Sequence, residues 1–413
     1  TTSAKITGQG STDSDIDAGG AISLTATDSS EINTIAIGVS ASGGGALGAA
    51  LAANVIANTI ETEISDSSVD SGATLALTSH SEAIIRSLGI GVSGAGGLAV
   101  QLTAMGNFIV NNTSALIANS TVNTLGNVTL LADDLAPTTN LLSTIIDKFV
   151  PDNDGDGSAD ADDPDGDSTK TRLNDALSDS PITDPDANIL SVVVSIAGSG
   201  GVAVSGILTG NIINNDISAV IDDSSVTSSA GFIALDADSR AGILGMSAGV
   251  GASGGVAVQA SFFGNEISVV TEALVKNGSV LDAFGDVKIE AVDESAIGSI
   301  GLSIAASGVA VSGVVGRNKI DNTTRAQISG SSSDSDNLYI TALSNSDINS
   351  FVGGVAVSGA LSAQLSFTWN DIGNTVEASI VADDSHDSII NADGDVALSA
   401  SDTSTIDSVS YTH

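Results

Sequence analysis

Apolar and polar residues alternate along most of this chain with a period of two. Segments such as VKIEAV (287–292) and VAV (202–204) place every second side chain on the same side. This is the periodicity of a β-strand, because successive strand residues point to opposite faces. Clusters of Ser, Asp, Asn and Gly separate the alternating segments, and these residues favour turns. The pattern predicts an all-β fold whose strands are each roughly 5–7 residues long.

The alternating segments belong to an internal repeat of about 53 residues, and each copy contains the same asparagine. The six copies have this residue at Asn54, Asn107, Asn211, Asn265, Asn318 and Asn370. The spacing is 52–54 residues, except for one step of 104 residues (211 − 107). Because only one copy lies in that step, one repeat plus an insertion of about 51 residues (104 − 53) accounts for it.

Repeats that contain only strands predict a β-solenoid, in which successive coils stack about 4.8 Å apart. We expect two or three coils per repeat and a rod of about 65–95 Å, from roughly 18–27 residues per coil. Small side chains, including 46 glycines, suit closely spaced layers. The alternative is a string of β-sandwich modules, but these need about 90–100 residues each and usually aromatic core residues. This chain has one tryptophan.

Two recurring motifs have open structural interpretations. The Gly-Gly-x-Ala-Val segment, as in 254–258, forms either a flat, closely packed face or a bend where backbones approach each other. The recurrent asparagine either satisfies backbone groups inside a turn with its side chain or adopts a left-handed turn conformation. Both interpretations of the asparagine are structural rather than catalytic.

Residues 133–187 do not follow the repeat and divide the predicted solenoid into segments 1–132 and 188–413. Residues 140–150 have apolar side chains at helical spacing, and Pro151 ends this predicted helix. A second short helix is predicted over residues 169–177. The acidic run between them completes a predicted helix–calcium loop–helix insertion.

Residues 152–163, DNDGDGSADADD, match the spacing of an EF-hand-type calcium loop. Acidic residues occupy loop positions 1, 3, 5, 9 and 12, and a glycine at position 6 permits a sharp turn. The predicted Ca²⁺ ligands are Asp152, Asp154, Asp156, Ser158 through its carbonyl, Asp160 and Asp163. The last position carries Asp instead of Glu, and in this the loop is similar to dockerin-type loops. The alternative is an acidic linker surrounded by solvent.

Composition excludes several classes of partner and site. The chain of 413 residues carries 50 acidic and 11 basic residues, a formal net charge of −39, which repels nucleic acid and anionic lipid. It has no cysteine, so disulfides, thiol catalysis and cysteine-ligated metals are excluded. The mean hydropathy of +0.30 is too high for a disordered polyanion. Gly- and Ala-rich stretches such as 42–57 lack the bulky residues of a membrane span.

The repeats resemble those of giant bacterial surface adhesins of the filamentous-haemagglutinin-like and leukotoxin-like kind. The resemblance rests on the phrase S-x-SGG-x-AV, followed by N-x-I-x-N and by SSV, together with the acidic, cysteine-free composition. It covers the repeats and implies a secreted, extended β-solenoid at the bacterial cell surface, used for adhesion or as a structural filament. It implies no catalytic residues.

Three functions remain open on this evidence. The first is a non-catalytic rod of an extracellular adhesin, with a host or surface receptor as a possible partner. The second is a self-assembling subunit of an extracellular filament or sheath. Both ends of the chain resemble the middle of a repeat, so we expect neighbouring copies or further repeats to pair with the end coils. The third is a polysaccharide-acting β-helix enzyme, which the scattered basic residues disfavour.

Overall fold

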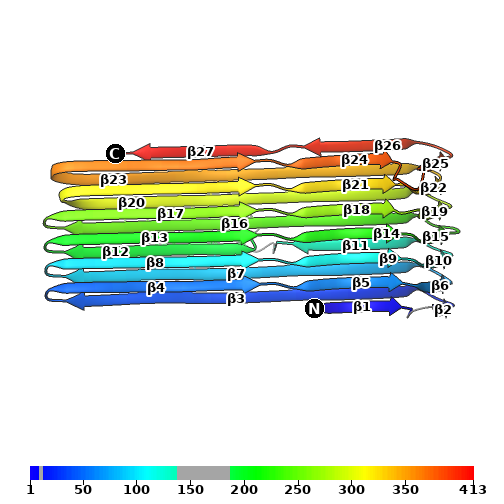
Figure 1. The fold of residues 1–413 in the computed structure, drawn as a ribbon, viewed down its shortest axis with the longest axis horizontal. Helices are drawn as coiled ribbons and strands as arrows, with labels where there is room; N and C mark the ends of the chain where they lie inside the picture. Colours follow the sequence, from blue (N-terminus) through cyan, green and yellow to red (C-terminus); the bar gives the residue numbers. More distant parts are fainter. Residues whose placement is uncertain (9–12, 137–186) are drawn as a thin grey trace, which may run out of the picture.

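The computed structural model describes residues 1–8, 13–136 and 187–413, and within these ranges the chain forms strands and no helix. The prediction of an all-β fold is confirmed. Every strand pairing is parallel, which fits the β-solenoid class (Figure 1). In each pass the chain runs along a long strand, returns along a second strand, and crosses two short strands before the next long strand begins.

The long strands carry the chain away from the short strands to a turn. They are β3 (Ile22–Ser42), β7 (Leu75–Ala95), β11 (Val128–Leu135) with β12 (Ile189–Ser199), β16 (Ile233–Ser253), and β26 (Val396–Asp402) with β27 (Thr405–Thr412). The return strands are β4 (Gly45–Ile56), β8 (Leu98–Ile109), β13 (Val202–Ile213) and β17 (Val256–Ile267). In β20 (Val287–Ile320) and β23 (Leu338–Ile372) both directions belong to one continuous strand.

Two seven-stranded sheets contain the short strands. The first contains β1 (Thr2–Thr7), β5 (Thr59–Ser65), β9 (Asn112–Ala118), β14 (Asp216–Asp222), β18 (Val270–Lys276), β21 (Thr323–Ser329) and β24 (Thr375–Val381). The second contains β2 (Ser14–Ala18), β6 (Ser67–Ser71), β10 (Thr121–Thr124), β15 (Ser225–Ser228), β19 (Val280–Ala283), β22 (Ser332–Ser335) and β25 (Ile389–Ala392).

One repeat makes one coil, so the prediction of two or three coils per repeat is wrong. Paired residues on adjacent strands are one repeat apart, as in Asn265 with Asn318. The strands are also longer than predicted, because β3 alone has 21 residues. A strand of this length spans about 70 Å, whereas seven stacked strands span about 29 Å. The long dimension therefore lies across the coil axis, and the predicted rod of 65–95 Å along the axis is also wrong (Figure 1).

Each coil has two parts with different interiors. The part we call the prism is bounded by the two sheets of short strands and the first halves of the long strands. Aliphatic side chains from all three sides meet in one core, as Leu77, Ile117 and Val122 do. The part we call the arm consists of the second halves of the long strands, packed on the return strands (Figure 1). A Cβ atom on Gly38 would overlap the backbone carbonyl of Ala49, so the two layers of the arm are very close.

The Gly-Gly segments form the bend at the tip of the arm, which is the second of the two predicted alternatives. A Cβ atom on Gly200 would lie 2.5 Å from the carbonyl oxygen of Gly96, and one on Gly254 would lie 2.6 Å from that of Gly200. No real side chain fits at such distances. Glycine is needed here because the bends of successive coils stack backbone on backbone.

The strand pairing shows how a coil accommodates the insertion. Asp134 pairs with Ser81, and Ile189 pairs with Ile85. Fifty-four residues (189 − 134 − 1) therefore stand where β7 has three (85 − 81 − 1). The difference of 51 residues agrees with the insertion length inferred from the repeat. β11 and β12 both pair with β7 and β16, so stacking continues on either side of the insertion.

Candidate functional site

All six predicted calcium ligands lie outside the described residues. Asp152, Asp154, Asp156, Ser158, Asp160 and Asp163 belong to the range 137–186, as do both predicted helices. Asp133 and Asp134, at the start of the predicted insertion, belong to strand β11. Within residues 1–8, 13–136 and 187–413, no three His, Asp or Glu side chains are grouped to hold a metal. The polar groups that the structure does bring together lie inside the coils.

The recurrent asparagines form a continuous ladder at the junction of prism and arm. Each side-chain amide donates to the side-chain oxygen of the next asparagine along the coil axis. The N···O distances between successive asparagines are 2.8 Å for Asn54–Asn107, 2.7 Å for Asn107–Asn211, 2.8 Å for Asn211–Asn265, 2.8 Å for Asn265–Asn318 and 2.7 Å for Asn318–Asn370. Both turn interpretations of this asparagine are therefore wrong, because the residue lies within a strand and points inward.

The ladder lies where the aliphatic core ends. Two residues after each ladder asparagine, an isoleucine such as Ile109 points into the prism. Across the coil, the long strand changes in the same way from Ile85 in the core to Ser87, which accepts a bond of 2.9 Å from Asn107. Asn107 and Ser87 are both buried. A buried amide needs hydrogen-bond partners, and stacking of identical residues supplies them at every coil.

A second asparagine position holds the corner between the return strands and the first short-strand sheet. The backbone N–H of Asn111 donates to the Asn215 side chain at 2.8 Å, and that of Asn322 to the Asn374 side chain at 3.2 Å. The side-chain amides point into the prism towards a column on the long strands. In one coil Val269 replaces the corner asparagine, and its backbone N–H donates to the side-chain oxygen of Asn322 at 2.9 Å.

That column alternates aspartate with serine from coil to coil. The pairing of successive long strands aligns the residues of this column, which are Asp28, Ser81, Asp134, Ser239, Asp293, Ser344 and Asp402. Successive aspartates are therefore two coils, or roughly 10 Å, apart. Two carboxylates in adjacent coils would repel each other strongly at about half that distance in the buried interior. The alternation was not predicted, although it is visible when the repeats are aligned.

Two of these aspartates are almost completely buried, with 2 % of Asp134 and 1 % of Asp293 exposed. Burial raises the pKa of each carboxyl from 3.8 to about 7, although hydrogen bonds from neighbouring asparagine and serine side chains oppose the change. Asn215 donates to Asp134 at 3.0 Å, and Asn322 to Asp293 at 2.8 Å. One oxygen of Asp134 has no hydrogen-bond partner, which further favours the neutral acid.

Most basic residues of the described ranges pair with carboxylates on their own or neighbouring coils. Arg325 lies between Glu272 at 2.9 Å and Glu377 at 3.3 Å, one on each adjacent coil. Lys5 contacts Glu61 at 2.6 Å and Glu63 at 2.7 Å. These partly exposed pairs bridge coils, and each contributes little on its own.

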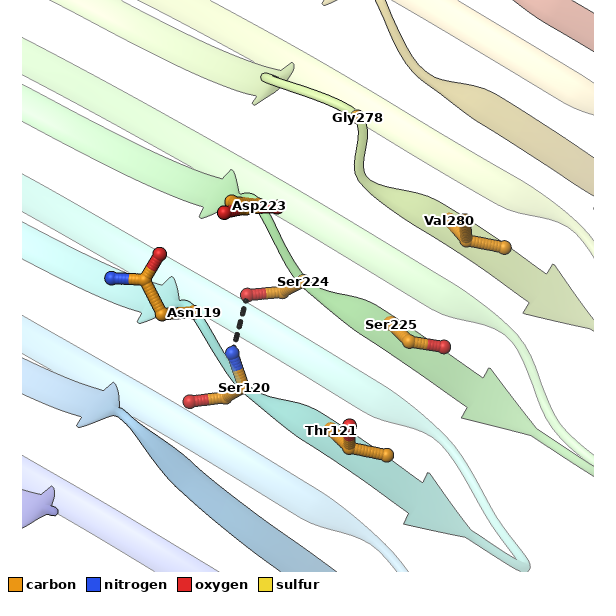
Figure 2. Close-up of a pocket in the computed structure, with 8 residues that line it drawn as sticks. All are labelled: Asn119, Ser120, Thr121, Asp223, Ser224, Ser225, Gly278 and Val280. Atoms are coloured by element: carbon orange, nitrogen blue, oxygen red, sulfur yellow. Dashed lines mark hydrogen bonds between the residues drawn. The ribbon is translucent and has the colours of Figure 1, made fainter. Parts of the chain in front are cut away.

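An open hollow of about 390 Å³ lies at the corner between the two short-strand sheets (Figure 2). Asn119 and Asp223 have left-handed backbone conformations there, with φ of 48° and 42°. Each is followed by a serine, and the backbone N–H of Ser120 donates to the Ser224 hydroxyl at 3.1 Å. The Ser224 hydroxyl also donates to the Asp222 carbonyl at 2.6 Å. These groups satisfy backbone atoms of the turn, so the hollow is a structural corner.

No family model, curated protein or solved structure matches this chain.

The buried polar side chains of the described residues are repeated along the coil axis, and they do not converge on one point. The ladder asparagine and the corner asparagine occur in nearly every coil. The sequence reveals their positions through the N-x-I-x-N phrase, but not their role. No helix in the described ranges is long and apolar enough to cross a membrane.

Proposed function

We propose that this chain forms an extracellular β-solenoid with a structural, non-catalytic role in a bacterial surface adhesin or fibre. The observation that carries the proposal is the asparagine ladder, in which each coil presents the same amide to the coil before and the coil after. Such an arrangement can be extended coil by coil in one dimension, which suits a structural role. The repeat phrasing shared with giant adhesins and the acidic, cysteine-free composition support a location at the cell surface.

The end coils are the surfaces through which we propose that the structure continues. Among the described residues, β1 and β24 pair on one side only, as do β2 and β25. The free backbone groups of an edge strand can pair with another strand. Further coils of the same protein would make a stalk, and neighbouring copies would make a filament, which is the alternative function. A receptor bound by the finished structure is a further partner in the adhesin proposal.

We expect copies of this chain to associate end to end along the coil axis. Appending a short segment rich in lysine and proline after His413 should block this growth and leave mainly single molecules, because each junction needs the C-terminal coil of one copy and the N-terminal coil of the next. A Gly/Ser segment of equal length is the control, because it adds neither charge nor a barrier to strand pairing. Negative-stain microscopy distinguishes the outcomes. If the two appended forms assemble alike, the end coils are not the assembly surface.

We also propose that the insertion binds Ca²⁺ through Asp152, Asp154, Asp156, Ser158, Asp160 and Asp163. Six carboxylates within twelve residues repel one another unless a cation neutralises them, and hard oxygen ligands suit calcium. Extracellular calcium modules bind in the range of about 10⁻⁴–10⁻³ M. Calcium would then neutralise the carboxylates of this loop.

Calorimetric titration should therefore detect Ca²⁺ binding in the wild type, and Asp156→Ala should weaken it at least tenfold. Asp282→Asn is the matched control, since it removes a carboxylate from the exposed surface of the prism. Chelation should leave the far-ultraviolet circular dichroism of the strands unchanged, because β11 and β12 stack without the insertion. Equal heats in wild type and Asp156→Ala would show that the acidic run is a solvated linker.

A further inference from the structure

The interior of the arm is mostly small and polar, with a few larger apolar side chains such as Met105 and Phe263, whereas its exterior is largely apolar. Its inward positions on the long strands include the register column Gly38, Gly91, Ser195, Gly249, Ser303 and Gly354. The outward positions on the return strands include the column Leu51, Ala104, Leu208, Phe262, Val315 and Phe367. The prism has the opposite distribution, with its aliphatic residues in the core. The apolar exterior of the arm therefore needs an explanation of its own.

Large side chains on this exterior are well exposed. The exposed fractions are 77 % for Leu47, 56 % for Leu208 and 49 % for Phe262. We call the outer side of the return strands the return face; it spans residues 45–56, 98–109, 202–213, 256–267, 309–320 and 361–372. The three columns that begin at Leu47, Ala49 and Leu51 contain only Gly, Ala, Val, Leu and Phe. Charged side chains occur on the return face only next to the prism, at Glu266, Arg317, Lys319 and Asp371.

We propose that the return face binds the return face of a second copy of this chain. Its six strands of twelve residues present a flat area of roughly 40 Å by 24 Å, or about 960 Å². A stable protein interface needs about 800 Å² from each partner. Two flat sheets can pack face to face at about 10 Å, as in β-sandwiches. An apolar patch of this size exceeds what monomeric proteins usually expose.

The charge distribution favours a copy with a defined orientation. The net charge of −39 opposes any association that brings two prisms together. The arm projects to one side of the prism (Figure 1), so two arms can overlap in opposite directions with the prisms at opposite ends. The acidic surfaces then lie several screening lengths of about 8–10 Å apart. Such an arrangement has two-fold symmetry, in which both copies use the same surface.

The test is self-association of the full chain measured by sedimentation velocity over a range of concentrations. Leu208 and Phe262 are paired neighbours near the middle of the return face, and Leu208→Glu with Phe262→Glu adds two charges there. We expect this double variant to associate at least tenfold more weakly than the wild type. Thr121→Glu with Ser225→Glu is the matched control, because it adds the same charges to paired neighbours on the exposed surface of the prism. Its association should match that of the wild type.

Three outcomes would overturn the proposal. The wild type could remain monomeric at all concentrations, or the two double variants could associate alike. In the third, the wild type would bind vesicles of phosphatidylcholine and lose this binding through Leu208→Glu with Phe262→Glu, without associating with itself. That result would identify lipid as the occupant. Association through the end coils does not involve the return face, so two double variants that associate alike would leave end-to-end association standing, whereas a wild type that never self-associates would contradict both.

Discussion

Replacing Asn211 with alanine should lower the free energy of unfolding by about 3–5 kcal/mol. Asn211 accepts a hydrogen bond from Asn107 at 2.7 Å and donates one to Asn265 at 2.8 Å. Both bonds are buried, and each contributes about 1 kcal/mol. The substitution also leaves the Asn265 oxygen without this donor inside a closed strand layer, which adds a desolvation cost of about 1–3 kcal/mol. Urea denaturation followed by circular dichroism measures the change.

Two further variants distinguish the contribution of the ladder to stability from the effect of removing any asparagine side chain. Asn370→Ala removes the last described member of the ladder, which has one asparagine neighbour, so we expect about half the effect. Asn123→Ala removes an exposed bond of 2.9 Å to Asp70 and should cost less than about 1 kcal/mol. An Asn211→Ala variant as stable as Asn123→Ala would mean that the ladder contributes nothing to stability.

Stability should fall as the pH rises from about 4 to about 8, and replacing Asp134 and Asp293 with asparagine should remove much of this dependence. Burial raises the pKa of both carboxyls to about 7, above the value of 3.8 expected in the unfolded chain. Between these values the folded state holds protons that the unfolded state releases. The stabilisation is complete below pH 3.8 and is lost as the pH passes about 7. The loss is at most about 4 kcal/mol for each carboxyl.

The double variant Asp134→Asn with Asp293→Asn should therefore be more stable than the wild type at pH 8. Asparagine keeps an oxygen that can accept the bonds from Asn215 and Asn322, but it carries no charge. Asp282→Asn removes a carboxylate from the exposed surface and should leave the pH dependence close to that of the wild type. Thermal unfolding at several pH values provides the comparison. Parallel curves for the wild type and the double variant would contradict the assignment of these buried acids.

Local interactions explain what could be predicted from the sequence. Alternation with a period of two predicted strands, and the constant spacing of six asparagines predicted stacked repeats with one insertion of about 51 residues. The Gly-Gly bend was one of two predicted alternatives. These features depend on residues close together in the chain or on strict repetition, so the sequence alone determined them.

Strand length could not be predicted, because polar residues within a strand resemble those of a turn. Asp28, Ser29 and Ser30 lie in the middle of β3, and Asp133 and Asp134 lie within β11. They remain in strands because distant parts of the preceding and the same coil supply hydrogen bonds, as Asn111 and Asn215 do for Asp134. Those partners are 23 and 81 residues away in sequence. The incorrect prediction of two or three coils per repeat followed from the same underestimate of strand length.

The sequence by itself determined that this chain is built from about 53-residue strand repeats with a regularly placed asparagine. Only the tertiary structure decided that each repeat makes one coil, that the asparagines bond to one another, and that the arm turns its apolar side chains outward. The last point follows from the close approach of the two layers, as at Gly38 and Ala49, where a large inward side chain such as Met105 or Phe263 fits only opposite or beside a glycine. Alternation along a strand defines two faces, but only the packing of distant strands decides which of them is the inside.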